Sequence, residues 1–268
     1  MRRRLDAELV RRGLVASRAR ATQVIGAGRV LVGGAPADSP SRQVSPSESI
    51  TVTAAPPPYV SRGGEKLAGA LDRFTVTATG RRALDVGAGH GGFTDCLLRA
   101  GAANVVAVDV GHGQFDWALR TDPRVTVLER KNARTLEDHE IGGAVDLVVA
   151  DVAFISLLTV APALYRCTKP RADLLLLVKP QFEAGRRAVG KGGIVRDPTV
   201  HTSVLRDVSA GLAAAGLPAG AVVPSPLRGA DGNVEFFLHC RRHAGAASGL
   251  GDRAIDAAVD EAHAAVPT

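Results

Sequence analysis

From residue 83 onward, short apolar runs alternate with helical stretches, and this alternation limits the possible folds more than any other feature. The strand-like runs span residues 83–86, 105–108, 125–128, 147–150, 174–178 and 236–239. The helical stretches between them include 92–100 and 198–215. Within the runs, apolar and polar residues do not alternate, which is typical of strands covered by helices on both faces. The pattern predicts an α/β fold with a mostly parallel sheet.

A small unit precedes this domain. Apolar residues at helical spacing over 5–10, and a stretch from Ser17 to Ile25 with serine as its cap, predict two short helices. The Gly33-Gly34 turn and the run 50–53 predict a few short strands. Three successive prolines at 56–58 predict a stiff, extended linker. We therefore expect a small α+β domain over 1–55, a linker over 56–62 and the large domain over 63–268.

Positive charge is concentrated at the start of the chain, whose net charge is +6. Only Asp6 and Glu8 oppose seven arginines within the first twenty residues: Arg2, Arg3, Arg4, Arg11, Arg12, Arg18 and Arg20. Such a cluster is typical of a surface that binds nucleic acid. The alternative is a terminal face that only favours solubility.

Cysteine usage and hydropathy indicate the compartment. The three cysteines, Cys96, Cys167 and Cys240, are far apart and form no CxxC pair, so we expect reduced thiols and no metal site. The start of the chain has no apolar stretch of signal-peptide length. The longest apolar region, 145–165, contains two aspartates and a proline and is interpreted as a buried strand followed by a helix. We expect a cytoplasmic protein with no membrane partner.

A glycine-rich turn follows the first strand-like run. Gly87, Gly89 and Gly92 form a GxGxxG pattern, which by itself is a weak sign of a dinucleotide site. Asp85, two residues before the first glycine, is placed to receive the methionine ammonium of S-adenosylmethionine. Asp109, at the end of the next strand, is placed to accept the ribose hydroxyls. The two acids together favour S-adenosylmethionine over NAD; the alternative for Asp85 is a cap on the turn.

Three further residues are candidate cofactor contacts. Asn132 and Ala133 follow the third strand-like run, where methyltransferases of this architecture border the adenine. An exposed loop is the equally weighted alternative. His90 lies in the glycine turn and is expected to face the cofactor, with a solvent-facing turn residue as the alternative.

Four charged residues are expected to gather at the mouth of that turn: Lys66, Asp151, Lys179 and Glu235. Asp151 and Lys179 each follow a strand-like run, and open α/β sheets bind their ligands at the carboxyl ends of strands. The alternative for Lys179 is an amine that extends from the sheet edge to solvent. Taken alone, Lys66 or Glu235 is more typical of a surface.

Two amines and two carboxylates beside a nucleotide loop suit the removal of a proton from a weakly acidic hydroxyl. Free lysine has a pKa of about 10.4 and is a poor base at neutral pH, but a neighbouring ammonium lowers that pKa. Our hypothesis is that Lys179 takes the proton, while Lys66 lowers its pKa and stabilises the alkoxide. Asp151 and Glu235 would orient the two amines. The run after Asp151 lacks the paired prolines of amino-methylating enzymes, which favours a hydroxyl acceptor.

The four residues resemble the Lys-Asp-Lys-Glu tetrad of RNA ribose 2′-O-methyltransferases, and the small unit resembles the S4 RNA-binding domain. In the S4 resemblance, Arg4, Arg18 and Arg20 match basic positions that touch RNA. The segments at 59–67, 85–94, 151–156, 179–183, 192–198 and 232–235 together resemble the TlyA family over nearly the whole chain. Many relatives have Ser-Thr where this chain has Gly89-His90, which leaves the cofactor affinity open.

The TlyA resemblance implies a Rossmann-like class I methyltransferase domain behind an S4 domain. It implies transfer of a methyl group from S-adenosylmethionine to the 2′-hydroxyl of cytidine in 16S rRNA, 23S rRNA or both, within ribosomal subunits, by a monomer that needs no metal. It also implies an effect on capreomycin and viomycin susceptibility. The alternatives are a non-catalytic RNA-binding or ribosome-assembly factor, a haemolysin, as older descriptions of the family have it, and a dehydrogenase. The last is disfavoured because no residue pair suits hydride transfer.

Overall fold

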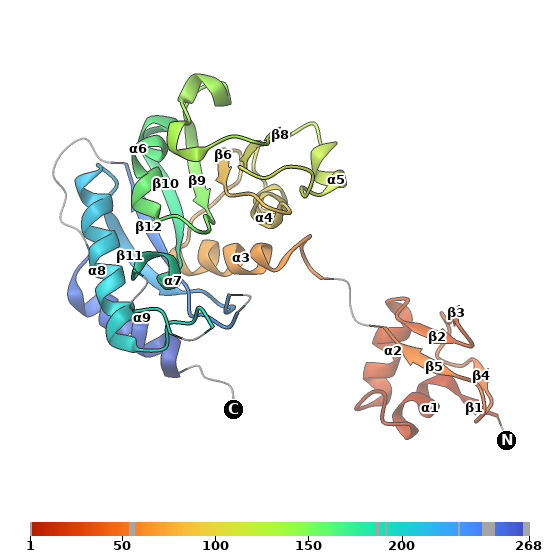
Figure 1. The fold of residues 1–268 in the computed structure, drawn as a ribbon. Helices are drawn as coiled ribbons and strands as arrows, with labels where there is room; N and C mark the ends of the chain where they lie inside the picture. The colour runs from red at the N-terminus through yellow and green to blue at the C-terminus, as the bar shows by residue number, and fades with distance from the viewer. Residues whose placement is uncertain are drawn as a thin grey trace. The chain divides into compact units, whose positions relative to one another are not determined.

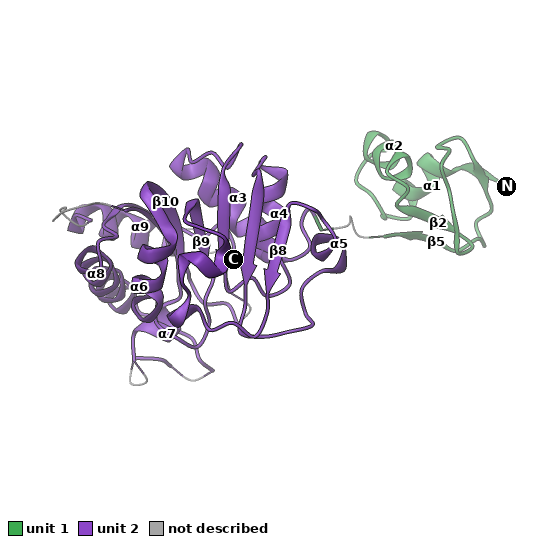
Figure 2. Ribbon diagram, turned by 90° about the horizontal axis from the view of Figure 1, so that it is seen from above, with its two compact units in different colours: residues 1–57 green, residues 58–268 purple. Residues whose placement is uncertain are grey.

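The computed structural model describes residues 2–53, 57–185, 188–190, 192–229, 231–242 and 250–264. The chain divides into two compact units, Met1–Pro57 and Pro58–Thr268, which Figure 2 colours green and purple. Each unit has a hydrophobic core of its own. Across the described ranges, no helix combines the length and the apolar character needed to cross a bilayer.

The small unit packs two helices on short strands. Its helices are α1 (Leu5–Arg11) and α2 (Arg18–Gly26). Its strands are β1 (Arg3–Arg4), β2 (Val30–Val32), β3 (Ala35–Pro36), β4 (Gln43–Val44) and β5 (Ile50–Val52), in sheets of order β3-β2-β5 and β1-β4. The Ser17 side chain accepts a hydrogen bond from the backbone of Arg20, which confirms the predicted start of α2. Leu5, Leu9 and Ile25 fill the core beneath the helices.

The large unit is built on one twisted sheet, which has seven strands among the described residues (Figure 1). Its order is β11-β12-β10-β9-β6-β7-β8. The strands are β6 (Arg82–Val86), β7 (Asn104–Val108), β8 (Val125–Leu128), β9 (Val145–Ala150), β10 (Thr168–Val178), β11 (Ala219–Pro224) and β12 (Phe236–Arg241). Neighbours from β8 to β10 are parallel, while β12 runs antiparallel to both β10 and β11. The predicted mostly parallel sheet is confirmed.

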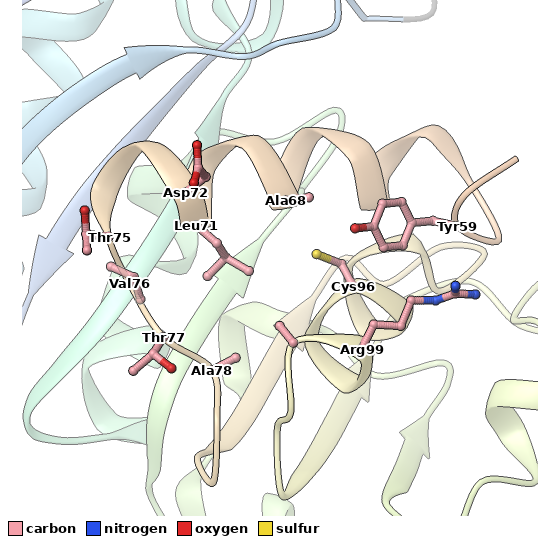
Figure 3. A pocket seen from close by; sticks show the side chains of 11 residues that line it. Tyr59, Ala68, Leu71, Asp72, Thr75, Val76, Thr77, Ala78, Cys96 and Arg99 are labelled. Atoms are coloured by element: carbon pink, nitrogen blue, oxygen red, sulfur yellow. The ribbon is translucent and has the colours of Figure 1, made fainter.

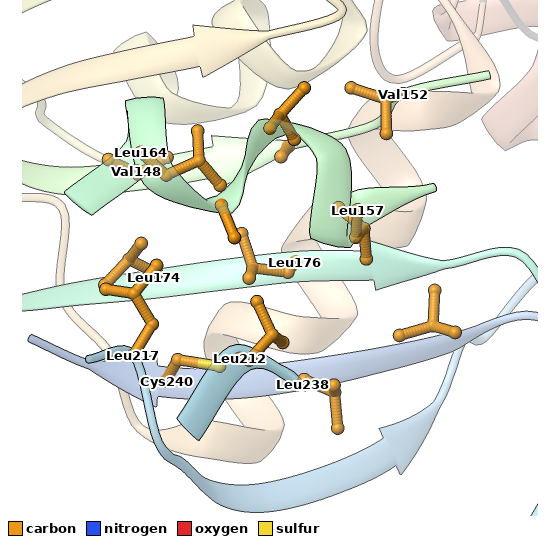
Figure 4. Packing of buried hydrophobic residues seen from close by; sticks show 14 of the residues in the cluster. Val148, Val152, Leu157, Leu164, Leu174, Leu176, Leu212, Leu217, Leu238 and Cys240 are labelled. Atoms are coloured by element: carbon orange, nitrogen blue, oxygen red, sulfur yellow. The ribbon is translucent and has the colours of Figure 1, made fainter. Parts of the chain in front are cut away.

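Helices cover both faces of this sheet. The regular helices are α3 (Arg62–Phe74), α4 (Gly92–Arg99), α5 (Trp117–Arg120), α6 (Leu157–Cys167), α7 (Pro180–Glu183), α8 (Pro198–Ala214) and α9 (Asp252–Ala264). Two 3₁₀ turns, η1 (Ala133–Thr135) and η2 (Asp138–Ile141), follow β8. Along β10, Leu174 and Leu176 pack toward α6 and α8 (Figure 4). Leu175 and Leu177 pack on the other face, toward α3 and α4. Burial on both faces explains the absence of apolar–polar alternation.

Helix α3 was not predicted from the sequence pattern, because its second and third residues are the glycines Gly63 and Gly64, which disfavour a helix. Both glycines lie where other groups approach closely. A Cβ atom on Gly64 would lie 2.2 Å from the Tyr59 ring, and one on Gly63 would lie 3.3 Å from the Phe93 ring. Packing of α3 on α4 therefore favours residues that helix propensity disfavours.

Candidate active site

Parallel strand order brings the predicted site residues to one edge of the sheet. Strand β9 lies between β6 and β10 and is parallel to both. Their last residues are Val86, Ala150 and Val178. The glycine turn, Asp151 and Lys179 each follow one of these ends, so all three emerge at the same edge.

The glycine turn and the end of β9 are in direct contact. Gly87 has a φ of 82°, in the left-handed region, and its backbone N–H donates to Val108 at 2.8 Å. A Cβ atom on Gly87 would lie 2.5 Å from the backbone oxygen of Asp151. Only glycine combines this conformation with this close approach, so the first glycine of the motif sets the position of Asp151 beside the turn.

A cavity of about 440 Å³ opens beside the turn. Its lining includes the predicted residues Gly87, Gly89, Asp109, Ala133 and Asp151. The Asp109 carboxylate accepts hydrogen bonds from the backbone N–H groups of Gly89 at 2.7 Å and Gly111 at 2.6 Å. Asp109 thus holds the glycine turn against the loop that follows β7, and its remaining lone pairs are available to a ligand.

Asp85 lies beneath the turn and is completely buried. Its Oδ2 accepts a hydrogen bond from the Thr94 hydroxyl at 2.7 Å, while Oδ1 has no partner among the described residues. Burial raises the pKa of Asp85 to about 7, opposed by the Thr94 hydrogen bond and reinforced by the negative charge of Asp151. A buried carboxylate oxygen without a partner suits a cationic ligand group.

The four charged residues form two lysine–carboxylate pairs. Lys66 Nζ lies 2.5 Å from Glu235 Oε2, and Lys179 Nζ lies 2.5 Å from Asp151 Oδ1. Burial raises the pKa of Glu235, the charges of Lys66 and then Lys179 lower it, and the charge of Asp151 raises it. The charges of Lys179 and Asp151 therefore act on the buried Glu235, while Asp151 is the one of the four that lines the cavity.

Lys66 and Glu235 come from opposite ends of the large unit's sequence. Lys66 lies on the first turns of α3 and is 8% exposed, while Glu235 immediately precedes β12 and is 3% exposed. The Glu235 backbone oxygen accepts from Ser225 at 2.8 Å. A Cβ atom on Gly229 would lie 2.5 Å from Glu235 Oε1. The turn before β12 is therefore closed tightly around this carboxylate.

His90 and Asn132 do not line the cavity. His90 is exposed, and its backbone oxygen accepts from Asp116 at 3.2 Å. Asn132 is exposed, and its side chain accepts from the Arg134 backbone at 3.0 Å, which caps η1. The arginines predicted to bind RNA, Arg4, Arg18 and Arg20, are exposed on the small unit.

Phe154 was not among the residues selected from the sequence. It lines the cavity, its side chain is 86% exposed, and its backbone has a φ of 65°. The Phe182 ring lies 5.1 Å from the Phe154 ring. An aromatic residue three positions after Asp151 was the available signal, but only the structure shows that its face is open.

A larger cavity, of about 590 Å³, lies between α3 and α4 (Figure 3). Tyr59, Leu71, Cys96 and Arg99 are among its lining residues, and none of the predicted site residues belongs to it. Burial raises the pKa of the Cys96 thiol to about 12, so this cysteine is a poor nucleophile. The smaller cavity beside the glycine turn is therefore the candidate active site.

The chain is similar to known methyltransferases along most of its length. Residues 59–242 match the FtsJ-like methyltransferase family, and residues 3–50 match the S4 domain. A Mycobacterium tuberculosis protein named 16S/23S rRNA (cytidine-2′-O)-methyltransferase TlyA is 52% identical, over 97% of this chain and 98% of that protein. Hemolysin A of Brachyspira hyodysenteriae is 37% identical, over 88% of this chain and 98% of its own length. The solved structure of a hemolysin-like protein from Streptococcus thermophilus superimposes with a TM-score of 0.75 at 35% identity, covering 98% of this chain and 96% of that one.

Proposed function

The chain belongs to the TlyA family of methyltransferases, and we propose from this premise that it methylates the ribose 2′-hydroxyl of cytidine in ribosomal RNA. The observation that carries the proposal is the pair of lysine–carboxylate contacts, Lys66–Glu235 and Lys179–Asp151, of which Asp151 also lines the cavity of the glycine turn. Removal of a hydroxyl proton needs a base held beside a group that stabilises the anion formed. The two pairs supply both.

The residues around the cavity fit S-adenosylmethionine. The unpartnered Oδ1 of Asp85 suits the ammonium of its methionine part. Asp109 is suited to its ribose and Ala133 to its adenine, both lining the cavity. When bound, this cofactor supplies a methyl group made electrophilic by the sulfonium.

Residues of the chain then accept the proton of the hydroxyl and release it. In this proposal Lys179 Nζ accepts the proton of the 2′-hydroxyl, and the ammonium of Lys66 stabilises the developing alkoxide oxygen. Asp151 and Glu235 hold the two amines in place through the 2.5 Å contacts. The transferred proton leaves to solvent after the methyl group is in place, so the charge of the site is restored.

Phe154 extends this site toward the nucleobase. Its open face at the cavity rim suits stacking with a base that has left its helix. Base–aromatic stacking contributes about 1–3 kcal/mol. We therefore assign Phe154 to holding the target nucleotide while its ribose faces Lys179.

The small unit would hold the RNA. Its match to the S4 domain and its exposed Arg4, Arg18 and Arg20 support binding to ribosomal RNA within a subunit. From the relatives' names we propose cytidines of 16S rRNA, 23S rRNA or both as targets. A cytoplasmic monomer and an effect on capreomycin and viomycin susceptibility complete the proposal.

The test is ribose-methylation mapping on 30S and 50S subunits from a strain that lacks the mark. The subunits are incubated with the protein and S-adenosylmethionine, and Lys179→Ala protein serves as the control. A new 2′-O-methylcytidine that depends on Lys179 is the expected result. If neither rRNA gains a ribose methyl group although the protein binds the cofactor, the proposal is wrong and a non-catalytic RNA-binding factor becomes the better interpretation.

A further inference from the structure

We propose that Asp6 joins Arg4 and Arg18 into one composite site for a single RNA phosphate group, separate from the contact that Arg20 makes. The inference deepens the proposed function, because it takes ribosomal RNA as the partner of the small unit. It makes Asp6 a positioning residue, although its negative charge by itself opposes RNA binding.

Asp6 is a buried carboxylate shared by two exposed arginines. It is 3% exposed, although it lies on the first turn of α1. Arg4 donates to it through Nε at 3.2 Å and Nη2 at 3.0 Å. Arg18, from the start of α2, donates through Nη2 at 2.8 Å. The carboxylate thus links side chains from two different helix starts.

The Asp6 carboxylate also accepts a hydrogen bond from the backbone. Its Oδ1 accepts a third kind of donor, the backbone N–H of Ala7, at 2.8 Å. These hydrogen bonds, that of Arg4 foremost, lower the pKa of Asp6 to about 2 against the opposing effect of burial. The carboxylate is therefore charged at neutral pH and holds both guanidinium groups in fixed positions.

The two arginines keep donors free for a ligand. Arg4 Nη1 and Arg18 Nε and Nη1 form no hydrogen bond to any residue within the described ranges. Their side chains are 47% and 62% exposed. Two guanidinium groups around one carboxylate leave a net positive charge of one. Free N–H groups on planar cations match the oxygens of a phosphate.

Other arginines of the small unit are already committed to the fold. Arg12 is only 20% exposed, and it donates to Glu8 and to backbone oxygens of Ser45, Pro46 and Glu48. Arg29 donates twice to the backbone oxygen of Thr53. Through these hydrogen bonds, Arg12 and Arg29 connect separate segments of the small unit. Within the basic cluster, Arg12 is thus used to hold the fold, whereas Arg4 and Arg18 keep free donors on the surface.

A phosphate is a better match than a nucleobase. A base edge is usually read by both donors of a planar fork on one arginine, whereas Arg4 already uses its side-on fork, Nε and Nη2, on Asp6. The donors left over come from two different side chains. Contacts of this kind position RNA and carry no sequence information.

A double-mutant cycle tests the composite site with the full-length protein and unmethylated ribosomal subunits as the probe. Arg4→Gln and Arg18→Gln should each weaken binding about 10-fold, and the double variant only slightly more, because either change dismantles the same site. Arg20, whose only side-chain hydrogen bond among the described residues is to Gln23, supplies the comparison. Arg4→Gln with Arg20→Gln should weaken binding about 100-fold, because separate contacts multiply.

Asp6→Asn tests the role of the carboxylate through the sign of its effect. Loss of a negative charge should tighten RNA binding if only net charge matters. If Asp6 positions the two arginines, Asp6→Asn should instead weaken RNA binding by about 3- to 10-fold. The dependence of the affinity on salt concentration should also decrease, by about one phosphate contact. Glu48→Gln is the matched control, because Glu48 is paired with Arg2 on the surface and its removal changes the net charge equally. This control should bind as well as the parent protein or slightly better.

Two outcomes overturn the proposal: multiplicative effects of Arg4→Gln and Arg18→Gln, or tighter binding by Asp6→Asn. If Asp6→Asn unfolds the small unit, as thermal unfolding would reveal, the cycle on exposed arginines decides alone. Methyl incorporation is measured in the same samples. If the parent protein transfers no methyl group while the variants show the expected binding pattern, the proposed function is contradicted and the phosphate site is still supported.

Discussion

At the scale of single residues, the site depends on buried charges that are paired with each other. Lys66 and Glu235 are both at least nine-tenths buried, and breaking one side of such a pair leaves an uncompensated charge. Lys179 and Asp151 are more accessible, at 14% and 24% of their side chains. The buried pair is therefore suited to fix geometry, and the accessible pair is suited to meet the substrate.

Lys179→Ala should lower the rate of methyl transfer at least ~100-fold, because general-base contributions are typically of this size. Affinity for S-adenosylmethionine, measured by calorimetry, should stay within about threefold. Lys169→Ala is the matched control, since Lys169 forms a similar ion pair with Asp146 but near the start of β10. The assignment of the base fails if Lys179→Ala and Lys169→Ala methylate equally well.

In the proposed function, the raised pKa of Asp85 makes cofactor binding dependent on pH. Burial raises the pKa of Asp85 to about 7. Between this pKa and the unfolded value of about 3.9, the Asp85 carboxyl is therefore protonated in the folded protein without cofactor and ionised in the unfolded chain. The stability contributed by this proton is fully present below the unfolded pKa of about 3.9 and is lost as the pH rises through 7. Binding of an ammonium at Asp85 requires the charged form, so acid favours the empty protein and neutral pH favours binding.

Affinity for S-adenosylmethionine should therefore fall about tenfold between pH 7.5 and pH 6, because below its pKa Asp85 must release a proton first. The amino group of the cofactor remains largely protonated over this range. Calorimetry at several pH values measures the change, and buffers of different ionisation enthalpy report the released proton. Asp85→Asn should bind weakly with no pH dependence. An unchanged affinity in the parent protein would contradict an ammonium contact at Asp85.

At the scale of secondary-structure elements, the turn after β6 and the end of β9 are held against each other. Asp151 donates its backbone N–H to Val86 at 2.9 Å, and Gly87 lies against the Asp151 carbonyl. The glycine turn and the start of the loop after β9 are therefore held together. A change that separates them should disturb both binding and chemistry.

Gly87→Ala should lower the free energy of unfolding by about 2–5 kcal/mol. A left-handed backbone costs about 1–2 kcal/mol for alanine, and steric overlap adds about 1–3 kcal/mol. Gly113→Ala is the matched control: its φ is 75°, but a Cβ atom there would meet nothing within 4 Å. Gly113→Ala should lower the free energy of unfolding only by the cost of the left-handed backbone, about 1–2 kcal/mol. Urea unfolding of both variants measures the difference, and equal costs would show that the contact with Asp151 is unimportant.

The elements themselves were predictable to different degrees. The strand-like run at 147–150 corresponds to the end of β9, because this apolar segment is buried on both faces. The run at 125–128 corresponds to β8, an edge strand whose residues are only half-buried or exposed. The helical stretches expected over 92–100 and 198–215 correspond to α4 and α8. Helix α3 was not predicted, because its second and third residues are glycines, which the approach of Tyr59 and Phe93 explains and local propensity does not.

At the scale of the whole molecule, the two units divide the work of the proposed reaction. The small unit carries the exposed arginines, and the large unit carries the cavity and the four charged residues. The two units have separate cores. Substitutions in one unit should therefore affect one step of the reaction and spare the other.

The triple variant Arg4→Gln, Arg18→Gln, Arg20→Gln should raise KM for ribosomal subunits by about 100-fold, because phosphate contacts supply most of the affinity for RNA. Its affinity for S-adenosylmethionine should equal that of the parent protein. Lys179→Ala should show the reverse pattern, with kcat reduced and subunit binding retained. Filter binding and steady-state kinetics measure both. A parallel loss of cofactor affinity in the arginine variant would refute this division.

The sequence alone predicts the α/β class, the glycine turn and the choice of the four charged residues, because apolar runs and motif spacing are local properties of the chain. How those four divide into pairs depends on the fold, since Lys66 and Glu235 are 169 residues apart and meet through sheet order. The fold also places His90 and Asn132 outside the cavity and Phe154 along it. Which arginines are free to bind RNA depended likewise on buried carboxylates such as Asp6, because contacts between distant elements determine where a side chain's donors are used.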